Sequence, residues 1–254
     1  MARARRSFKA FSPFSVTAIK RWYRLAASTP VSSEYETVVE VYGGSSIAAT
    51  GVRKPAAATA PNGLPVATWD ETDVWVMPLD TSGTGNNSTT KFGFFLWFKP
   101  ASVSGIQRIL TIAIAAGGAS AEKLQLYANN ATLRCECYIT NANGRFGTSG
   151  NVLAAGVWSC IYLQYDSSRG GDACLRIYHN GNNESLTFAN LGAGGTLGAF
   201  QATTGNAFIG AATNTDTPTQ AILNGGQTGP NYWSMDENLS TDEEARLRAF
   251  EVPD

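Results

Sequence analysis

Charged residues are scarce in this chain. Only 15% of its 254 residues are Asp, Glu, Lys or Arg, whereas an average globular domain has about 25%. The 19 basic and 20 acidic residues nearly cancel and leave a net charge of −1, which argues against nucleic-acid binding by bulk electrostatics. We therefore expect no nucleic-acid partner. The hydrophobic content of 43% still suffices for a large core.

Histidine is nearly absent, and the common catalytic patterns are missing. The single histidine, His179, stands directly before an Asn-Gly turn, where a structural role is expected rather than a place in a catalytic triad. No Gly-rich loop is followed by the Lys-Ser/Thr pair that binds phosphates. The sequence also lacks alternating acids along one strand, which would set two carboxylates across a cleft for glycoside hydrolysis. These absences predict that the protein is not an enzyme.

No hydrophobic run approaches the length of a membrane span. The longest run covers residues 109–116, whereas a spanning helix needs about 20 apolar residues. Residues 1–6 are basic, like the start of a signal peptide, but no apolar segment follows them. We expect a protein made in the host cytoplasm without a signal peptide, and with no membrane partner.

Cysteine is rare, and its placement favours a structural role. Cys135 and Cys137 lie two residues apart on a predicted strand, and therefore share one face with Leu133 and Ile139. This pattern is typical of a core stripe in which the thiol acts as a small apolar group. A disulfide among the four cysteines and a metal site remain as alternatives, although one histidine adds little to a metal site. The other two cysteines are Cys160 and Cys174.

Short aromatic and β-branched runs, separated by turn residues, fill residues 92–181. This pattern predicts an antiparallel all-β sandwich. Residues 92–99 and 157–165 are apolar on both faces, which predicts strands in the middle of a sheet. Residues 123–127 and 132–140 are expected to form a hairpin around two asparagines. Near the end of the chain, residues 240–243 (STDE) have the pattern of a capping box and predict one short helix.

The first residues differ in charge from the rest of the chain. No acidic residue precedes Glu34, so we interpret residues 1–15 as an extended basic arm and residues 16–254 as one domain. The arm is either simply solvated, or it docks on an acidic neighbour or on nucleic acid. The residues predicted to dock on a partner are Arg3, Arg5, Arg6, Phe8, Lys9, Phe11 and Phe14.

The order and spacing of several motifs resemble a known family. The motifs are FFLWFKP at 94–100, the W…YD segment at 158–166, LRIYHNG at 175–181, FIG at 208–210 and LSTDEE at 239–244. Together they resemble the concanavalin A-like lectin/glucanase superfamily, in its laminin-G-like branch of phage and bacterial type. The resemblance covers roughly residues 20–250 and implies an antiparallel two-sheet jelly-roll sandwich. Members bind sugars or proteins, cleave glycans or build structure, so the fold alone assigns no function.

Two functions from different classes fit these observations. The first is a structural virion protein of a bacteriophage: a capsid decoration, head-fibre or tail component. The basic arm, the low charge and the first half favour it, because RKP at 53–55, NGLP at 62–65 and WDETD at 69–73 resemble phage and bacterial members. Its partners would then be other virion proteins or further copies of the chain, and its location the virion. The alternative is a carbohydrate-binding module or adhesin that contacts host surface glycans.

Aromatic side chains would stack on sugar rings in the second interpretation. The candidates are Trp75, Tyr127, Tyr138 and Tyr232, although core packing is the stronger expectation for each. We predict no cofactor and assign no metal ligand. The resemblance leaves calcium open, because laminin-G-like domains use loop carboxylates for it. The aspartates in suitable loops are Asp70, Asp73, Asp166 and Asp172, and turn formation is their commoner role.

Overall fold

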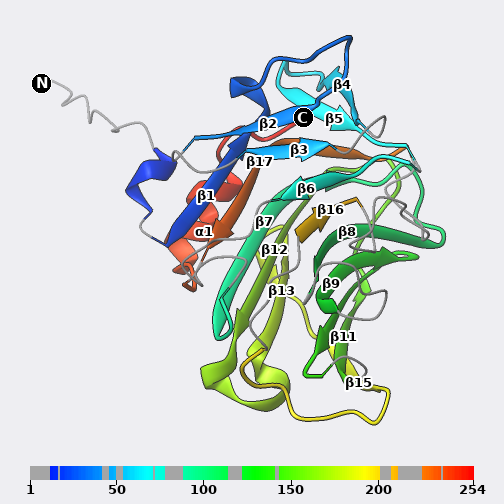
Figure 1. Cartoon of the computed structure of the whole chain (residues 1–254), viewed down its shortest axis with the longest axis vertical. Helices are drawn as coiled ribbons and strands as arrows, with labels where there is room; N and C mark the ends of the chain where they lie inside the picture. Colours follow the sequence, from blue (N-terminus) through cyan, green and yellow to red (C-terminus); the bar gives the residue numbers. More distant parts are fainter. Residues whose placement is uncertain are drawn as a thin grey trace, which may run out of the picture.

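A computed structural model describes most of the chain. The described residues are 12–16, 18–41, 46–49, 54–70, 72–77, 88–113, 122–140, 143–200, 207–210, 225–235 and 237–254. They form two antiparallel β-sheets that face each other, and one short helix (Figure 1). The predicted all-β sandwich with a short C-terminal helix is confirmed.

The first sheet, which we call sheet A, is built around three long strands. Strand β7 pairs with β12 on one side and with β17 on the other. Strand β17 then pairs with β1 over one part of its length and with β5 over another. In spatial order the first five strands are β14 (Asn182–Asn183), β13 (Leu175–His179), β12 (Ser159–Asp166), β7 (Lys91–Lys99) and β17 (Gln227–Met235). Next to β17 lie β1 (Ile19–Arg24), along one part of its length, and β5 (Pro65–Thr68), along the other. Strand β4 (Ala56–Thr59) pairs with β5.

The second sheet, sheet B, carries the remaining strands. Its first strand also pairs with β1 and so ties the two sheets together at one edge. In spatial order the strands are β2 (Thr37–Glu40), β3 (Ile47–Ala49), β6 (Trp75–Met77), β16 (Ala207–Ile209), β8 (Ile106–Ala113), β9 (Glu122–Asn129), β10 (Thr132–Tyr138), β11 (Gly144–Asn151) and β15 (Thr187–Leu191). Short 3-10 turns are η1 (Pro13–Ser15), η2 (Leu25–Ala27), η4 (Ser167–Arg169) and η5 (Gly171–Cys174).

The core lies between the two sheets and follows the alternation of the strands. In β7, Phe94 and Leu96 point into this core, whereas Phe95 and Trp97 belong to a second apolar cluster on the opposite face. Because successive side chains of a strand point to opposite faces, a strand that is apolar at every position needs cover on both. Strand β12 shows the same division. The prediction that these two strands are central and buried on both faces is confirmed.

The second cluster is covered by the two ends of the domain. Helix α1 (Thr241–Arg248) lies against the outer face of sheet A, where its Leu247 is fully buried (Figure 1). Val16 and Trp22, from the start of the domain, pack into the same cluster. The Trp22 indole donates to the Asn231 side chain at 2.7 Å. This face of sheet A is therefore filled by the chain itself.

Three strands depart from the sequence pattern. The prolines at 55 and 61 favour a loop between them, but β4 forms there at the edge of the sheet, where its only strand partner among the described residues is β5. The apolar pattern at 232–235 marks only the last part of strand β17, which begins five residues earlier and passes through Pro230, since a register shift between Thr228 and Tyr232 lets proline enter it. Strand β11 was not predicted at all.

Only residues 12–15 of the predicted N-terminal arm are among the described residues. Pro13 is buried and η1 ends at Ser15, so the chain approaches the domain before residue 16. Phe14 lies in η1, and its side chain is outside the described part. The other residues predicted to dock, Arg3, Arg5, Arg6, Phe8, Lys9 and Phe11, also lie outside the described residues.

The four cysteines follow the core interpretation. All four are free and buried, and the Sγ atoms of Cys135 and Cys137 lie 4.0 Å apart on the core side of β10. Burial raises the pKa of the Cys135 thiol well above its ordinary value. A thiol held neutral in this way is a poor nucleophile and a poor metal ligand. The predicted structural role of the cysteines is therefore confirmed.

Replacing Ser240 with Ala should lower the free energy of unfolding by about 1 kcal/mol. The Ser240 hydroxyl accepts from the Glu243 backbone N–H at 3.3 Å, while the Glu243 carboxylate accepts from the Ser240 N–H at 2.9 Å, which confirms the predicted capping box. Urea unfolding followed by circular dichroism measures the change. Thr241→Ala, one residue further on, is the matched control and should change the stability by less than about 0.5 kcal/mol.

Candidate functional site

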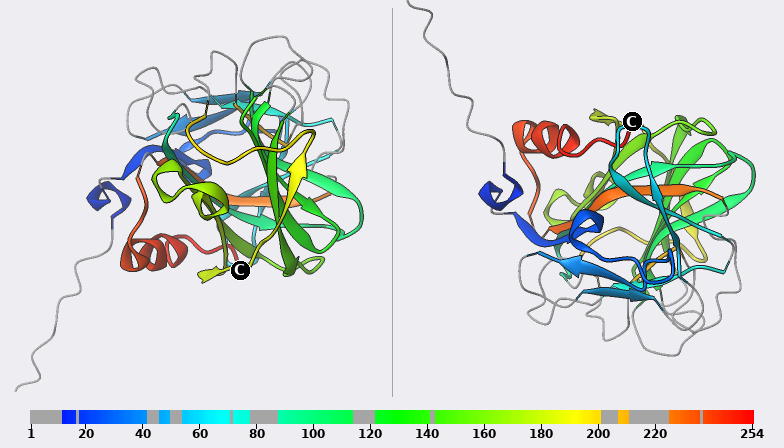
Figure 2. Two further views of the ribbon diagram at one scale, coloured as in Figure 1. Left: turned by 90° about the horizontal axis from the view of Figure 1, so that it is seen from below. Right: turned by 90° about the horizontal axis from the view of Figure 1, so that it is seen from above.

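A polar hollow lies between η5, β11 and the loop after β15. These segments are at the lower end of the sandwich (Figure 1). Its volume is about 260 Å³. Figure 2 (left) views this end of the molecule from below. We call this hollow the rim pocket. It is lined by Arg145, Gly171, Asp172, Gly195 and Thr196.

An ion pair connects the two sides of the rim pocket. Arg145 comes from β11 of sheet B, and Asp172 comes from η5, which follows β12 of sheet A. The guanidinium donates through Nε to one carboxylate oxygen at 2.5 Å and through a terminal nitrogen to the other at 2.7 Å. Its third nitrogen donates to the Asn190 side-chain oxygen at 2.7 Å. Because the guanidinium is planar, three bonds fix its plane in one orientation.

Glycines allow the loop after β15 to approach the hydrogen-bonded array of Arg145, Asp172 and Asn190. Gly194 has a φ of +78°, and a Cβ atom there would lie 2.6 Å from the Asn190 side-chain carbon. A larger residue would therefore push the loop away from the amide that orients Arg145. Gly171, on the opposite side, has a φ of +55°. Both walls of the rim pocket thus rest on backbone conformations that favour glycine.

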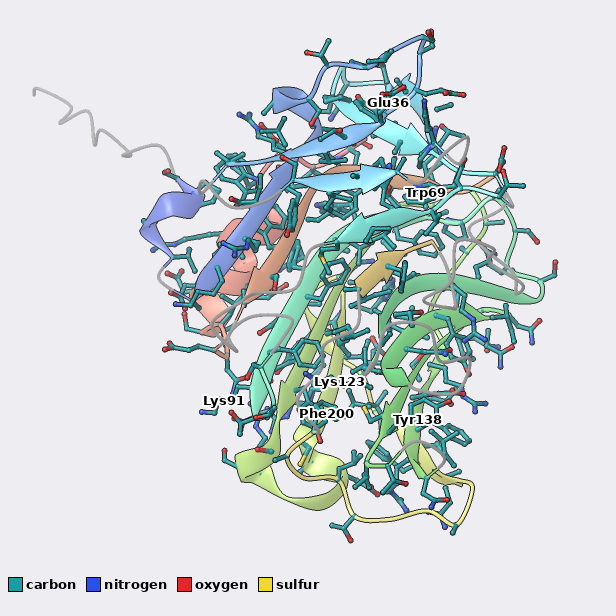
Figure 3. The ribbon with its side chains drawn as sticks, in the orientation of Figure 1. Glu36, Trp69, Lys91, Lys123, Tyr138 and Phe200 are labelled. Atoms are coloured by element: carbon teal, nitrogen blue, oxygen red, sulfur yellow. The ribbon has the colours of Figure 1, made fainter. Side chains whose placement is uncertain are left out.

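The far end of the same loop is anchored in the core. Leu197 and Phe200 are buried, and the Tyr165 hydroxyl donates to the Gly198 carbonyl at 2.6 Å. Figure 3 shows Phe200 beside Lys123 in the space between the sheets. The loop that carries Gly195 and Thr196 is therefore held at both ends.

A second polar arrangement lies on the outer face of sheet B. Glu136 on β10 accepts from the Tyr127 hydroxyl at 2.5 Å, the Tyr138 hydroxyl at 2.7 Å and the Arg134 guanidinium at 2.8 Å. The same guanidinium lies 3.5 Å from the centroid of the Phe146 ring. Burial, together with the bond to Glu136, raises the pKa of Tyr127. Both oxygens of the Glu136 carboxylate therefore accept hydrogen bonds from neighbouring side chains of the same face.

The four predicted sugar-stacking aromatics separate into two pairs. Trp75 and Tyr232 are fully buried in the core, where their ring centroids lie 5.7 Å apart. Tyr127 lies on the outer face of sheet B and is only 3% exposed. Tyr138 is half-buried on the same face, near the lower edge of the sheet (Figure 3). Of the four, Tyr138 alone keeps a partly exposed ring, and none of them lines the rim pocket.

The loop aspartates that were considered for calcium are held by protein groups. Asp166 accepts from the Ser168 backbone and from the Asn238 side chain. Asp70 and Asp73 hold one turn, in which the Asp70 N–H donates to Asp73 at 2.7 Å. Burial raises the pKa of Asp73 to about 6. Within the described residues, no three His, Cys, Asp or Glu side chains gather in a way that could hold a metal ion.

The single histidine has a structural setting. One ring nitrogen of His179 lies 3.0 Å from the Ser159 hydroxyl, and the ring joins neighbouring strands of sheet A. Burial lowers its pKa, although the nearby Glu184 opposes this effect.

In the described part of the chain no helix is long and apolar enough to cross a membrane.

A wider groove of about 410 Å³ lies at the opposite end of the sandwich. It is bordered by Lys99, Val157 and Trp158, and the Lys99 ammonium lies 5.5 Å from the Trp158 ring centroid. Trp158 is partly buried against the apolar cluster on the outer face of sheet A. Among the described residues, no side-chain hydrogen bond fixes the charged side chains of this groove. The rim pocket is therefore the better organised of the two hollows.

Sequence reasoning found only part of the rim pocket. Asp172 was considered as a loop aspartate, but Arg145, Asn190 and Thr196 were not singled out. Arg145 and Asp172 are 27 residues apart, and no short motif joins them. The only sequence features that marked this region were the turn before Arg145 and the Gly-rich stretch at 192–198.

Solved structures with the same fold come from proteins of different kinds. A Trypanosoma rangeli sialidase in complex with sialic acid has a TM-score of 0.61 at 12% identity, over 94% of this chain and 34% of the sialidase. The receptor binding domain of a botulinum neurotoxin C/D mosaic serotype has a TM-score of 0.62 at 9% identity, over 91% of this chain and 51% of that one. The chain thus spans about a third of the first protein and half of the second. At these identities the similarity shows the fold alone.

The sequence itself is matched by one family. No curated protein sequence matches the chain. Residues 77–226 match the family model described as the concanavalin A-like lectin/glucanases superfamily. The match covers more than half of the chain, and both the jelly-roll sandwich and the resemblance of the motifs agree with it. The chain therefore belongs to the concanavalin A-like lectin/glucanases superfamily.

Proposed function

We propose that this protein is a carbohydrate-binding module without catalytic activity, and that the rim pocket holds one sugar ring. The observation that carries the proposal is the array formed by Arg145, Asp172 and Asn190 beside an open hollow. Its donors and acceptors are fixed in direction, as recognition of a sugar's hydroxyl groups requires. Membership of a superfamily of lectins and glucanases supports the same function.

The contents of the rim pocket favour binding over hydrolysis. Glycoside hydrolysis commonly uses two carboxyl groups on either side of the scissile bond. Among the described residues, the lining of the rim pocket contains one carboxylate, Asp172, and Arg145 binds both of its oxygens. The sialidase that shares the fold is about three times as long as the region matched here, so we carry over no activity from it.

The proposed function replaces the virion protein as the main interpretation. The virion hypothesis rested on the basic arm, the low charge and the resemblance of the first half to phage members, and the charged residues of the arm lie outside the described part of the chain. The comparisons with known proteins give it no support, whereas they agree with a lectin-like module. Surface glycans are therefore the partners that we propose.

A glycan array probed with the wild-type protein and with Thr196→Trp tests the proposal. Thr196 is exposed and lines the rim pocket, so an indole at this position should fill the hollow and reduce binding by roughly tenfold or more. Asn183→Trp, on the exposed edge strand β14, is the matched control and should bind like the wild type. Equal binding by Thr196→Trp and the wild type would contradict the assignment of the site.

A further inference from the structure

We infer that the rim pocket selects neutral sugars and discriminates against sugars that carry a carboxylate. This inference rests on the proposed function and adds the class of ligand. Among the described residues, the charged side chains that line the rim pocket are Arg145 and Asp172, and the opposite charges of the pair cancel. An entering anion therefore meets no net positive potential.

The hydrogen bonds within the pair strengthen this conclusion. Arg145 already uses three of its five N–H groups, two on Asp172 and one on Asn190. A guanidinium can bind a carboxylate through two parallel N–H groups either at its Nε edge or at the end formed by its two terminal nitrogens, and Asp172 occupies the Nε edge. One N–H group remains on each terminal nitrogen, and each can donate to a hydroxyl oxygen.

A carboxylate in the rim pocket would also lie close to the carboxylate of Asp172. Like charges at short range repel, and removing a second anion from water adds a further cost. A sugar hydroxyl has no such difficulty, because it can donate to an Asp172 oxygen and accept from Arg145. The Thr196 hydroxyl, on the loop side, can likewise donate or accept. The chemistry of the lining therefore matches a neutral polyol.

The size and lining of the hollow restrict the ligand further. Its volume of about 260 Å³ falls just below the range of about 300–1,000 Å³ that is usual for pockets of drug-sized ligands. No aromatic side chain is among the described lining residues, so recognition depends on hydrogen bonds rather than on stacking. One neutral pyranose ring, at the end of a glycan, is the ligand that fits this description.

Matched pairs of methyl glycosides test the inference by isothermal titration calorimetry. Methyl glucoside, galactoside and mannoside are each compared with the corresponding uronic acid, which differs only in the carboxylate at C6. The wild-type protein should bind a neutral member at least roughly tenfold more tightly than its acid. Asp172→Asn removes the negative partner of Arg145 and should reduce or reverse this preference.

The outcomes separate the inference from the function on which it rests. A wild-type protein that binds an acid as well as its neutral partner, or better, overturns the neutral selectivity but leaves sugar binding intact. Binding of none of the six sugars overturns both. The wild-type comparison decides the inference even if Asp172→Asn does not fold.

Discussion

Replacing Lys123 with Met should raise the free energy of unfolding at pH 7 by about 1–2 kcal/mol. The Lys123 side chain is fully buried between the sheets, and its ammonium lies 5.3 Å from the centroid of the Phe200 ring. Its hydrogen bond to the Ser88 carbonyl offsets only part of the cost of desolvation. Methionine has a similar shape and carries no charge. Urea unfolding of the two proteins measures the difference.

The same substitution should change the pH dependence of stability. Burial lowers the pKa of Lys123 from 10.5 to about 8. Between these pH values the unfolded chain keeps the proton and the folded chain releases it, so the stability of the wild type rises with pH in this window. Below pH 8 the full cost of the buried charge is present. The advantage of Lys123→Met should therefore be largest below pH 8 and shrink towards pH 10.5.

A surface lysine provides the control for this experiment. Lys91 lies 3.7 Å from Asp166 and its side chain is 43% exposed, so Lys91→Met should change the stability by less than about 1 kcal/mol. If Lys123→Met were less stable than the wild type at pH 7, the account of Lys123 as a buried, desolvated charge would be wrong. An advantage that did not vary with pH would contradict the lowered pKa.

Replacing Arg145 with Ala should reduce the affinity for the glycan found on the array by about 10–100-fold, since hydrogen bonds to charged groups contribute about 1.5–3 kcal/mol. The substitution removes the donors of the rim pocket and leaves Asp172 and Asn190 without the group that orients them. Stability should change by no more than about 1 kcal/mol, because the ion pair is partly exposed. Titration calorimetry and urea unfolding separate the two effects.

Arg176→Ala is the matched control for this substitution. Arg176 lies on β13 of sheet A, is half-buried, and is not among the lining residues. Its replacement should leave the affinity unchanged within about twofold, as expected for a residue away from the site. An Arg145→Ala protein that is as stable as the wild type and binds the glycan equally well would remove Arg145 from the site.

The sequence predicted those strands whose pattern is set by burial alone. In β7 and β12 apolar side chains occupy both faces, because one face meets the core and the other meets the cluster under α1. The helix could be predicted because its cap depends on residues within one turn. Such local signals do not require knowledge of the rest of the fold.

Strand β11 escaped prediction because glycine normally weakens a strand. Its sequence, GRFGTSGN, contains three glycines, which suggests a loop. In the structure a Cβ atom at Gly147 would lie 3.0 Å from both Leu186 and Phe188. A larger residue at this position would therefore force these two side chains to shift. No local pattern in the sequence could show this close packing.

The rim pocket could not be predicted for a related reason. Arg145 lies on sheet B and Asp172 in the turn η5 that follows a strand of sheet A, so the two residues meet only when the sandwich closes. The sequence did indicate, correctly, that the aromatic residues of the long strands would be used in the core. It could not show that the polar residues at the ends of the strands converge on one hollow.

Chemical-shift mapping of the ¹⁵N-labelled protein with its array-selected glycan tests the central claim most directly. We expect the largest shifts at the backbone amides of Gly171, Gly195 and Thr196 and at the Arg145 Nε–H, all of which line the rim pocket. The amides of Gly156 and Val157, in the groove at the opposite end, should remain unchanged. Shifts confined to that groove or to the outer face of sheet B, around Glu136, would contradict the rim pocket as the sugar-binding site.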